Sequence, residues 1–331
     1  MSAPSGTSER PAVYAGKEHS WAVHPLTRAN RGLRALTPTI LELSATILFH
    51  KSETGKNFYK WLNDNYTPFQ INVWWTFGIT SVLYWVIGLL FMAVDMTESP
   101  KMLYKYKLQP SQRITWKDYQ KVCWIVLRNQ IVVALPVTIL VGLFAPFRTT
   151  TPLPGAWSTI GTYLFCLLCE ETGFYYVHRY LHSAKQYKRF HKLHHEYTAP
   201  VALSSTYCTL TEHLLSNIMP ILLGVMILRS HWSMMVMFFC GLEVGTLSTH
   251  SGYNLPFNFN ALQHDWHHYL FTENFGPTGI LDQVHGTNQV FKSWLGELSR
   301  RDAIAQAEGK PWKDVYETAR KDVAARSAST N

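Results

Sequence analysis

The sequence predicts an all-α membrane protein with four to six membrane-embedded helices and a histidine-rich helical domain on the cytoplasmic side. Three observations support this fold class. Only 16% of the 331 residues are charged, whereas soluble domains carry about 25%. The run 71–94 contains no Asp, Glu, Lys or Arg, and about 20 apolar residues suffice to cross the hydrocarbon core of a bilayer. Finally, 12 of the 15 histidines lie between His178 and His285.

The uncharged run 71–94 is predicted to be the first complete span. Two further apolar stretches follow, at 122–146 and 156–177. We expect them to form a helical hairpin, because the short link between them is rich in proline and glycine, which turn the chain. The second stretch carries Glu170 and Glu171 near its end.

The remaining apolar segments are shorter. The fifteen uncharged residues 214–228 are few for a full crossing. Together with 232–249 they predict either a tight hairpin that enters the bilayer and returns, or two spans with a cramped turn. The stretch 38–50 is shorter still, which favours an interfacial or re-entrant position. The number of membrane-embedded helices is therefore expected to lie between four and six.

The basic residues predict the orientation. Segment 95–121 holds six Lys and Arg against three Asp and Glu, and the segment after residue 177 is basic as well. Basic loops remain on the cytoplasmic side of a membrane, so the histidine-bearing segments are expected to face the cytoplasm. The net charge of +8 follows from this topology and requires no nucleic-acid partner.

Composition divides the chain into four regions. Residues 1–36 are polar, lack the apolar core of a signal peptide and are predicted to form a mobile tail. Residues 37–160 form the membrane-helix region. Residues 161–290 form the histidine-rich domain, which includes the membrane hairpin 214–250. Residues 291–331 turn polar and predict a soluble helix followed by a tail.

Most of the clustered histidines repeat two spacings. His178 and His182 are four residues apart, which places both on one face of a helix. A His-x-x-His-His spacing begins at His191 and again at His264, and His250 ends the last apolar segment. The nine expected metal ligands are His178, His182, His191, His194, His195, His250, His264, His267 and His268.

Nine imidazoles are too many for one metal ion, since a structural zinc site closes at four ligands. They fit two ions with four or five imidazoles each and a position open for another ligand. Imidazole binds Zn, Cu, Fe and Ni, and an all-imidazole pair beside the membrane suits iron and oxygen chemistry better than zinc hydrolysis. No catalytic side chain is expected beyond this di-metal centre.

Other polar residues near the repeats are expected to support the centre. His213 and His285 lie outside the repeats and are possible additional ligands or hydrogen-bond donors. Glu170, Glu171 and Asp265 are expected to accept hydrogen bonds from the ligating imidazoles. The remaining histidines are expected in ordinary hydrogen-bonded positions at the surface or at the edge of the core; they are His19, His24, His50 and His231.

Over about residues 70–295 the chain resembles the fatty acid hydroxylase superfamily of membrane di-iron enzymes, and within it the branch similar to sterol C4-methyl oxidases and sterol desaturases. The resemblance rests on His178-Arg179 with His182, His191-Lys-Leu-His194-His195-Glu196-Tyr-Thr-Ala-Pro200, His250-Ser-Gly-Tyr253, His264-Asp-Trp-His267-His268 and Asn274-Phe-Gly276. One segment differs: where sterol oxidases commonly carry Ala-His-Pro-x-Glu, this chain reads Cys208-Thr-Leu-Thr-Glu212.

The resemblance implies two non-haem iron ions, O2 as oxidant, and electrons from NAD(P)H that arrive through cytochrome b5 or its reductase. It also implies a multi-pass position in the endoplasmic reticulum membrane. Asn274, which lies in a segment similar to the family's closing segments, is expected to support the metal ligands.

The predicted function is a membrane monooxygenase that oxidises an unactivated C–H bond, such as a methyl group, of a sterol or sterol-like terpenoid. Two alternatives are open. The same site could desaturate a lipid or hydroxylate a fatty acyl or sphingoid chain. The protein could also bind metal without catalysis and regulate lipid synthesis, although its full set of nine histidines argues against that.

Overall fold

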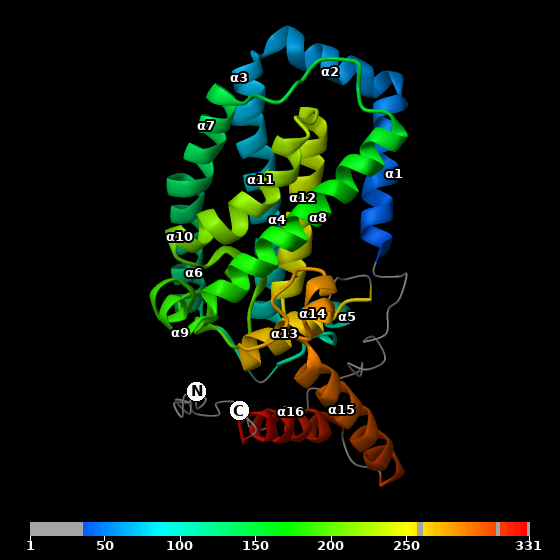
Figure 1. Ribbon diagram of the computed structural model, residues 1–331. Helices are drawn as coiled ribbons and strands as arrows, with labels where there is room; N and C mark the ends of the chain where they lie inside the picture. The colour runs from blue at the N-terminus through cyan, green and yellow to red at the C-terminus, as the bar shows by residue number, and fades with distance from the viewer. Residues whose placement is uncertain (1–35, 111, 257–260, 309–311, 330–331) are drawn as a thin grey trace.

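The computed structural model describes residues 36–110, 112–256, 261–308 and 312–329, and these form helices joined by loops, with no β-strand in the described part. The expected tail 1–36 lies, apart from Leu36, outside the described residues. In Figure 1 helix α1 runs from the middle of the molecule to one end, where α2 and α3 lie, and α15 and α16 lie at the other end. The predicted all-helical membrane architecture is thus confirmed.

The helix bounds are α1 Thr37–Lys51, α2 Glu53–Asn65, α3 Pro68–Gln70, α4 Thr76–Thr97, α5 Lys101–Tyr104, α6 Trp116–Asn129, α7 Leu135–Phe144, α8 Ala156–Leu181, α9 Ala184–Gln186, α10 Leu210–Glu212, α11 Met219–Ile227, α12 Trp232–His250, α13 Ala261–Leu270, α14 Ile280–His285, α15 Gln289–Ala307 and α16 Trp312–Ser329. Four π-helical turns extend them, at Ile71–Trp75, Gln130–Ala134, Tyr187–His191 and His213–Ile218.

Four helices among the described residues are long and apolar enough to cross a membrane: Pro68–Thr97, Trp116–Phe144, Leu210–Ile227 and Trp232–His250. Each but the last contains one of the π turns, and in two of them a proline stands two residues after the end of the turn, Pro136 and Pro220. Proline cannot donate the backbone hydrogen bond of a regular turn. Because the wider π turn precedes it, the span continues past the proline.

The expected span 156–177 corresponds to α8, which is not among these four helices. It nevertheless runs diagonally across the bundle, from the α1–α3 end toward the opposite end (Figure 1). It packs closely on α11, since a Cβ added to Gly224 would lie 2.6 Å from the Cα of Cys166. The expected interfacial stretch 38–50 lies within α1, which is also not among the four.

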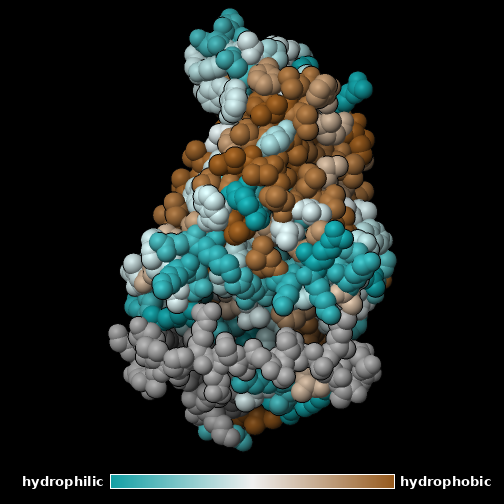
Figure 2. Space-filling view, turned by 90° about the vertical axis from the view of Figure 1, so that its left-hand side faces the viewer, coloured by the Kyte–Doolittle hydropathy of each residue, from teal (hydrophilic) through white to brown (hydrophobic). Residues whose placement is uncertain are grey.

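The surface divides into layers along the length of the molecule. Figure 2 shows a belt of apolar residues over the upper part of one face, with a polar cap above it and a broad polar region below. An apolar belt of this kind is the surface expected of a bundle surrounded by lipid. The part of the chain that bears the clustered histidines extends below the belt, where polar side chains predominate.

A C-terminal hairpin of α15 and α16 closes this polar end. The indole rings of Trp266 on α13 and Trp294 on α15 stack with centroids 4.7 Å apart. Leu298, Ala319 and Val323 join them in one buried cluster. The segment 291–331, expected to hold one soluble helix, therefore contains most of two helices, and they support α13 from below.

Candidate metal centre

The nine predicted histidine ligands come from four parts of the fold that meet at one end of the bundle. The last turn of α8 supplies His178, and His182 directly follows the helix. A π turn ends at His191, and a short 3-10 turn, His194–Glu196, follows it. The last turn of α12 supplies His250, and α13 supplies the rest of the set. Their ring nitrogens fall into two groups, and within each group the possible ligand atoms lie within 4.8 Å of one another.

The first group contains five histidines, from α8, the π turn, the 3-10 turn and α13. Its ε nitrogens are close together: Nε2 of His191 lies 3.2 Å from Nε2 of His178, 2.8 Å from that of His182 and 3.0 Å from that of His195. The members of this group are His178, His182, His191, His195 and His267.

The second group contains four histidines. Nε2 of His250 lies 2.8 Å from Nε2 of His264 and 3.4 Å from that of His194. Nε2 of His268 lies 3.1 Å from that of His264. The two groups adjoin, because the ring centroids of His195 and His268 are only 4.6 Å apart.

Both His-x-x-His-His repeats are divided between the groups. The first and last histidines of each repeat join one group, and the middle histidine joins the other. His191 and His195 thus lie in the first group and His194 in the second. In the second repeat the assignment is reversed. Each repeat therefore contributes to both groups, which places the two groups side by side.

The hydrogen bonds at the δ nitrogens indicate that a cation belongs between the ε nitrogens. Nδ1 of His178 donates to the carbonyl of Phe275 at 2.7 Å, and Nδ1 of His250 donates to the carbonyl of Thr246 at 2.9 Å. A neutral imidazole has only one proton. Its Nε2 therefore presents a lone pair, and lone pairs that face one another repel unless a metal ion accepts them.

His267 gives the clearest case. Its ring is fully buried, and its Nδ1 donates to the carbonyl of Glu273 at 2.6 Å. Its Nε2 has no hydrogen-bond partner among the described residues. A buried acceptor without a partner is costly, and the donor set around it consists of imidazole nitrogens. These residues therefore fit a first-row transition metal.

Burial keeps the imidazoles neutral. Desolvation lowers the pKa of His191 to about 3. It also holds the pKa of His195 and His267 well below the usual value, with the neighbouring imidazoles adding to the effect. The same causes lower the pKa of His194, His264 and His268. Because a metal binds the unprotonated ring, these side chains are ready to ligate at neutral pH.

Comparisons with known proteins agree with this geometry. Residues 163–287 match the family model "Fatty acid hydroxylase". The chain is 40% identical to fatty acid hydroxylase ahd1 of Mycosarcoma maydis, over 85% of this chain and 74% of the relative. The chain belongs to the fatty acid hydroxylase family. It is therefore an oxygen-dependent oxidoreductase, and its apolar helices make it a multi-pass membrane member of that family.

Other relatives have two kinds of name. Fatty acid hydroxylase domain-containing protein 2 of Homo sapiens is 33% identical over 68% of this chain and 71% of its own length. Methylsterol monooxygenase 1 of Danio rerio is 28% identical over 68% of this chain and 80% of its own length. No solved structure matches the chain.

In this family member a carboxylate that sequence reasoning did not single out contacts a predicted ligand. Nδ1 of His191 lies 2.7 Å from Oε1 of Glu212, and both side chains are buried. Glu212 ends the segment 208–212 in which the chain departs from the sterol oxidases. The position of Glu212 at the start of an apolar segment is the sequence signal for this contact, because a buried carboxylate needs a partner.

The expected supporting carboxylate Glu171 holds a loop instead of contacting an imidazole, and Asp282, which was not expected to support the centre, holds the same loop. Glu171 accepts hydrogen bonds from the amide and hydroxyl of Thr278, at 2.9 and 2.8 Å, and from the amide of Leu281 at 2.8 Å. Asp282 accepts from the amides of Phe275 and Gly276, both at 2.8 Å. The loop carbonyl of Phe275 in turn receives the His178 hydrogen bond. Glu171 and Asp282 thus orient ligands through the backbone.

The other expected supporting residues lie close by. Asp265, between the histidines of α13, accepts from Nε2 of Gln109 at 2.7 Å and lies 3.6 Å from Nη1 of Arg320 on α16. Asn274 donates to the carbonyl of Gln263 at 3.3 Å. Glu170 is buried beside Glu171 and contacts no imidazole that the structure records.

The two possible additional ligands lie outside both groups. His285 on α14 stacks on Tyr175, and its Nε2 lies 3.0 Å from the hydroxyl of Tyr176. His213 begins a π turn beside Glu212, and its Nδ1 accepts from Asn217 at 3.2 Å. Neither His213 nor His285 belongs to the two groups of histidines described above. His213 instead lines a cavity among the spans.

Proposed function

We propose that this protein is a di-iron monooxygenase that oxidises a C–H bond, such as a methyl group, of a sterol or sterol-like terpenoid. The observation that carries the proposal is the pair of adjoining, buried imidazole groups at the end of an apolar helix bundle. A substrate dissolved in the bilayer can reach such a site without passing through water. The similarity to proteins named methylsterol monooxygenase 1 favours the sterol.

Iron is the proposed metal, held by the nine histidines of the two groups. When bound, the iron pair would supply the O2 activation that an unactivated C–H bond requires. The electrons are proposed to come from NAD(P)H through cytochrome b5 or its reductase. The proposed location is the endoplasmic reticulum membrane, with the metal end in the cytoplasm, because the basic segments 95–121 and 179–192 lie at that end.

The chain's own residues orient the ligands and exclude water. The carbonyls of Phe275, Glu273 and Thr246 fix three imidazole rings through their δ nitrogens. Aromatic rings cover the first group: the ring centroid of Phe271 lies 4.8 Å from that of His195, and that of Phe275 lies 5.1 Å from that of His182. A dry, apolar wall protects a reactive oxidant from side reactions with water.

A fatty acyl or sphingoid chain is the second candidate substrate, and desaturation is the second candidate reaction. The 40% identity to a protein named fatty acid hydroxylase ahd1 favours the acyl chain. Both candidates use the same metal centre, so the distinction lies in the product.

Metal analysis and product analysis test the proposal together. Purified, iron-loaded protein is expected to contain about two iron ions per chain. With a reductase system, labelled O2 and a methylsterol, the product is expected to gain one labelled oxygen atom. Substoichiometric iron after loading, or a product with a new double bond and no label, would overturn it. Oxidation of an acyl chain but not of the sterol would establish the second candidate.

A further inference from the structure

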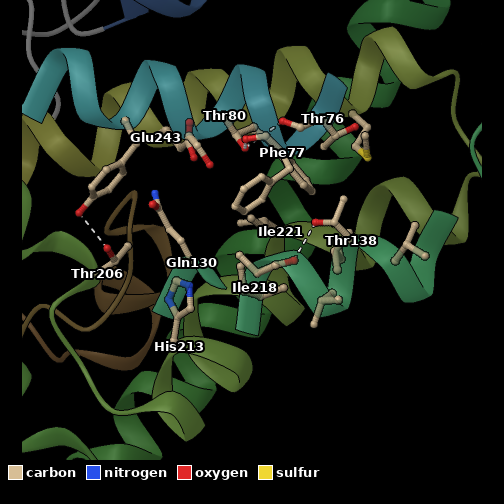
Figure 3. Close-up of a pocket in the computed structure, with 18 of the residues that line it drawn as sticks. Thr76, Phe77, Thr80, Gln130, Thr138, Thr206, His213, Ile218, Ile221 and Glu243 are labelled. Carbon is tan, nitrogen blue, oxygen red and sulfur yellow. Dashed lines mark hydrogen bonds between the residues drawn. The ribbon is translucent and has the colours of Figure 1, made fainter. Parts of the chain in front are cut away.

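A cavity lies inside the helix bundle, apart from the histidine groups. It is bounded by α4, the π turn Gln130–Ala134 with α7, the π turn His213–Ile218 with α11, and α12 (Figure 3). The space measures about 790 Å³, including the part that opens outward. Because that figure counts the space open to the surroundings, the enclosed part is much smaller, and the cavity admits one end of a lipid and not the whole molecule.

Most polar groups of the cavity wall already have partners. The hydroxyl of Thr80 donates to the carbonyl of Thr76 at 3.0 Å, and that of Thr138 donates to the carbonyl of Ala134 at 2.8 Å. Thr206 donates to the hydroxyl of Tyr84 at 2.8 Å. These hydroxyl groups therefore need no hydrogen bond from a ligand.

Two polar atoms of the wall have no hydrogen-bond partner among the described residues: Nε2 of His213 and Oε2 of Glu243. His213 is only 4% exposed. Its Nδ1 accepts from the amide of Asn217 at 3.2 Å, so its Nε2 carries the ring proton and is an unused donor. In Figure 3, His213 and Glu243 come from different walls and lie toward the end of the cavity where Gln130 and Thr206 lie.

The chemistry of this end indicates what it binds. A lipid hydroxyl can accept a hydrogen bond from an imidazole N–H and donate one to a carboxyl oxygen. The described residues that line the cavity include no Lys or Arg, so a phosphate headgroup or a fatty-acid carboxylate would find no cation to pair with. Apolar side chains such as Phe77, Ile218 and Ile221 complete the wall.

We propose that this cavity binds the hydroxyl-bearing end of an uncharged membrane lipid, with His213 as donor and Glu243 as acceptor. A sterol and a linear long-chain alcohol share this chemistry. The site is separate from the metal centre. Glu243 precedes His250 by seven residues of α12, which corresponds to about 10 Å along a helix. Lipid binding can therefore be measured without metal, O2 or turnover.

Matched lipids test the proposal on the full chain in phosphatidylcholine nanodiscs, with retained lipid counted by native mass spectrometry. The pairs are cholesterol against cholestane, and oleyl alcohol against octadecene. Retention of at least one hydroxylated member about tenfold above its partner is expected, since a site that hydrogen-bonds a hydroxyl rejects the analogue without one. The pair that responds identifies a sterol or a linear alcohol. Equal retention within both pairs would overturn the proposal.

Charged lipids supply a second arm. Oleic acid and octadecylamine, which carry a carboxylate and an amine on a long chain, are expected to be retained less than the preferred hydroxylated lipid. A preference for the amine would assign Glu243 to a cation, and a preference for the acid would assign the site to an anion. Either result contradicts a hydroxyl site.

Variants assign the two residues. His213→Leu and Glu243→Leu are each expected to reduce retention of the hydroxylated lipid about tenfold, because each removes one hydrogen bond in an apolar setting. Glu243→Gln, which keeps an acceptor, is expected to restore most of it. Thr138→Val is the matched control, since that hydroxyl is already used within its own helix.

Iron content per chain serves as the measure of folding. Selective retention that survives both leucine substitutions in iron-replete protein would overturn the assignment to this cavity. If the leucine variants lose iron, His213→Met, which has no hydrogen-bond donor, and Glu243→Gln, which keeps an acceptor, replace them, and the His213 variant alone is expected to lose retention. Because lipid retention and turnover are separate readouts, failure of the proposed oxidation leaves this result interpretable.

Discussion

The two His-x-x-His-His repeats have the same spacing but different backbones. The second repeat lies within the regular helix α13. The first runs from a π turn that ends at His191 into a 3-10 turn, where His195 has φ −84° and ψ 15°. Both repeats nevertheless divide their histidines between the two groups in the same manner. What the centre requires is the direction of each ring, and two different backbones provide it.

The repeats also differ in what braces them. A side-chain carboxylate, Glu212, fixes His191 of the first repeat. In the second repeat a backbone carbonyl, that of Glu273, fixes His267. The second repeat is further tied to the C-terminal hairpin through Asp265 and Arg320. The first repeat therefore depends on one side chain, whereas the second depends on a loop and on tertiary packing.

The largest expected effect comes from removing one histidine of the smaller group. His194→Ala leaves three imidazoles in the second group, so iron content is expected to fall from about two to about one per chain, and oxidation by at least about 100-fold. His195→Ala leaves four in the first group and should lose less iron. Iron analysis and turnover on the purified variants measure both.

The same comparison in the second repeat checks the division of the repeats. His268→Ala should behave like His194→Ala, and His267→Ala like His195→Ala. His285→Ala, which removes a histidine outside both groups, is the control and should retain about two iron ions. If neighbouring histidines gave equal losses throughout, the division of each repeat between two metals would be wrong.

Removing the carboxylate behind His191 is expected to have the next largest effect. Glu212→Ala should weaken iron binding about 10-fold to 100-fold, as loss of a group that orients a ligand does. Glu273→Gln is the counterpart in the second repeat. Its side chain accepts from the amides of Val290 and Phe291, both at 2.7 Å, and its carbonyl persists in the variant. Iron affinity should change less there. Competition with a chelator measures both, and a larger effect at Glu273 would contradict the comparison.

Much of this architecture can be predicted from the sequence. The run 71–94 lies within the apolar span Pro68–Thr97, because hydropathy alone decides such a segment. Eight of the nine histidines are recognisable because their spacings repeat, His250 because it ends the last apolar segment, and the structure brings all nine into two groups. The division of each repeat was not predicted, since spacing on one helical face suggests one shared metal and the first repeat is not a regular helix.

The supporting contacts could not be predicted, because they join residues far apart in the chain. Gln109 reaches Asp265 over 156 positions, and Arg320 reaches Gln109 over 211. No local pattern encodes such pairs. The cavity depends on two π turns, whose positions propensity does not predict. The expected contacts from Glu171 to imidazoles are replaced by contacts to a loop, a role that only the fold reveals.

A substitution at Arg320 tests whether its ion pair with Asp265 ties the C-terminal hairpin to the second repeat. This buried arginine lies over the ring of Tyr269, 4.2 Å from its centroid, and beside Asp265. Arg320→Met leaves the Asp265 carboxylate buried without its cation, and should destabilise the docked hairpin by about 1–3 kcal/mol. Limited proteolysis of α15 and α16 measures the loss. Adding Asp265→Asn should recover part of it. Unchanged proteolysis in the single variant would show that the ion pair does not hold the hairpin.

The smallest expected effect concerns the outer face of the same hairpin and its pH dependence. Hydrogen bonds from Arg300 and Arg301 lower the pKa of Glu297 to about 2, and Arg301 also pairs with Asp322 on α16 at 2.8 Å. Because the folded pKa lies below the unfolded value, the stabilisation is complete above about pH 4.5 and is lost as the pH falls toward 2. Exposure to solvent limits this stabilisation to less than about 1 kcal/mol.

Glu297→Gln should therefore speed hydrogen exchange in α15 and α16 slightly at pH 7, and the difference from the unsubstituted protein should shrink as the pH approaches 2. A difference that persists in acid would mean that Glu297 acts through packing, and that charge at the hairpin surface contributes nothing to the support of the second repeat.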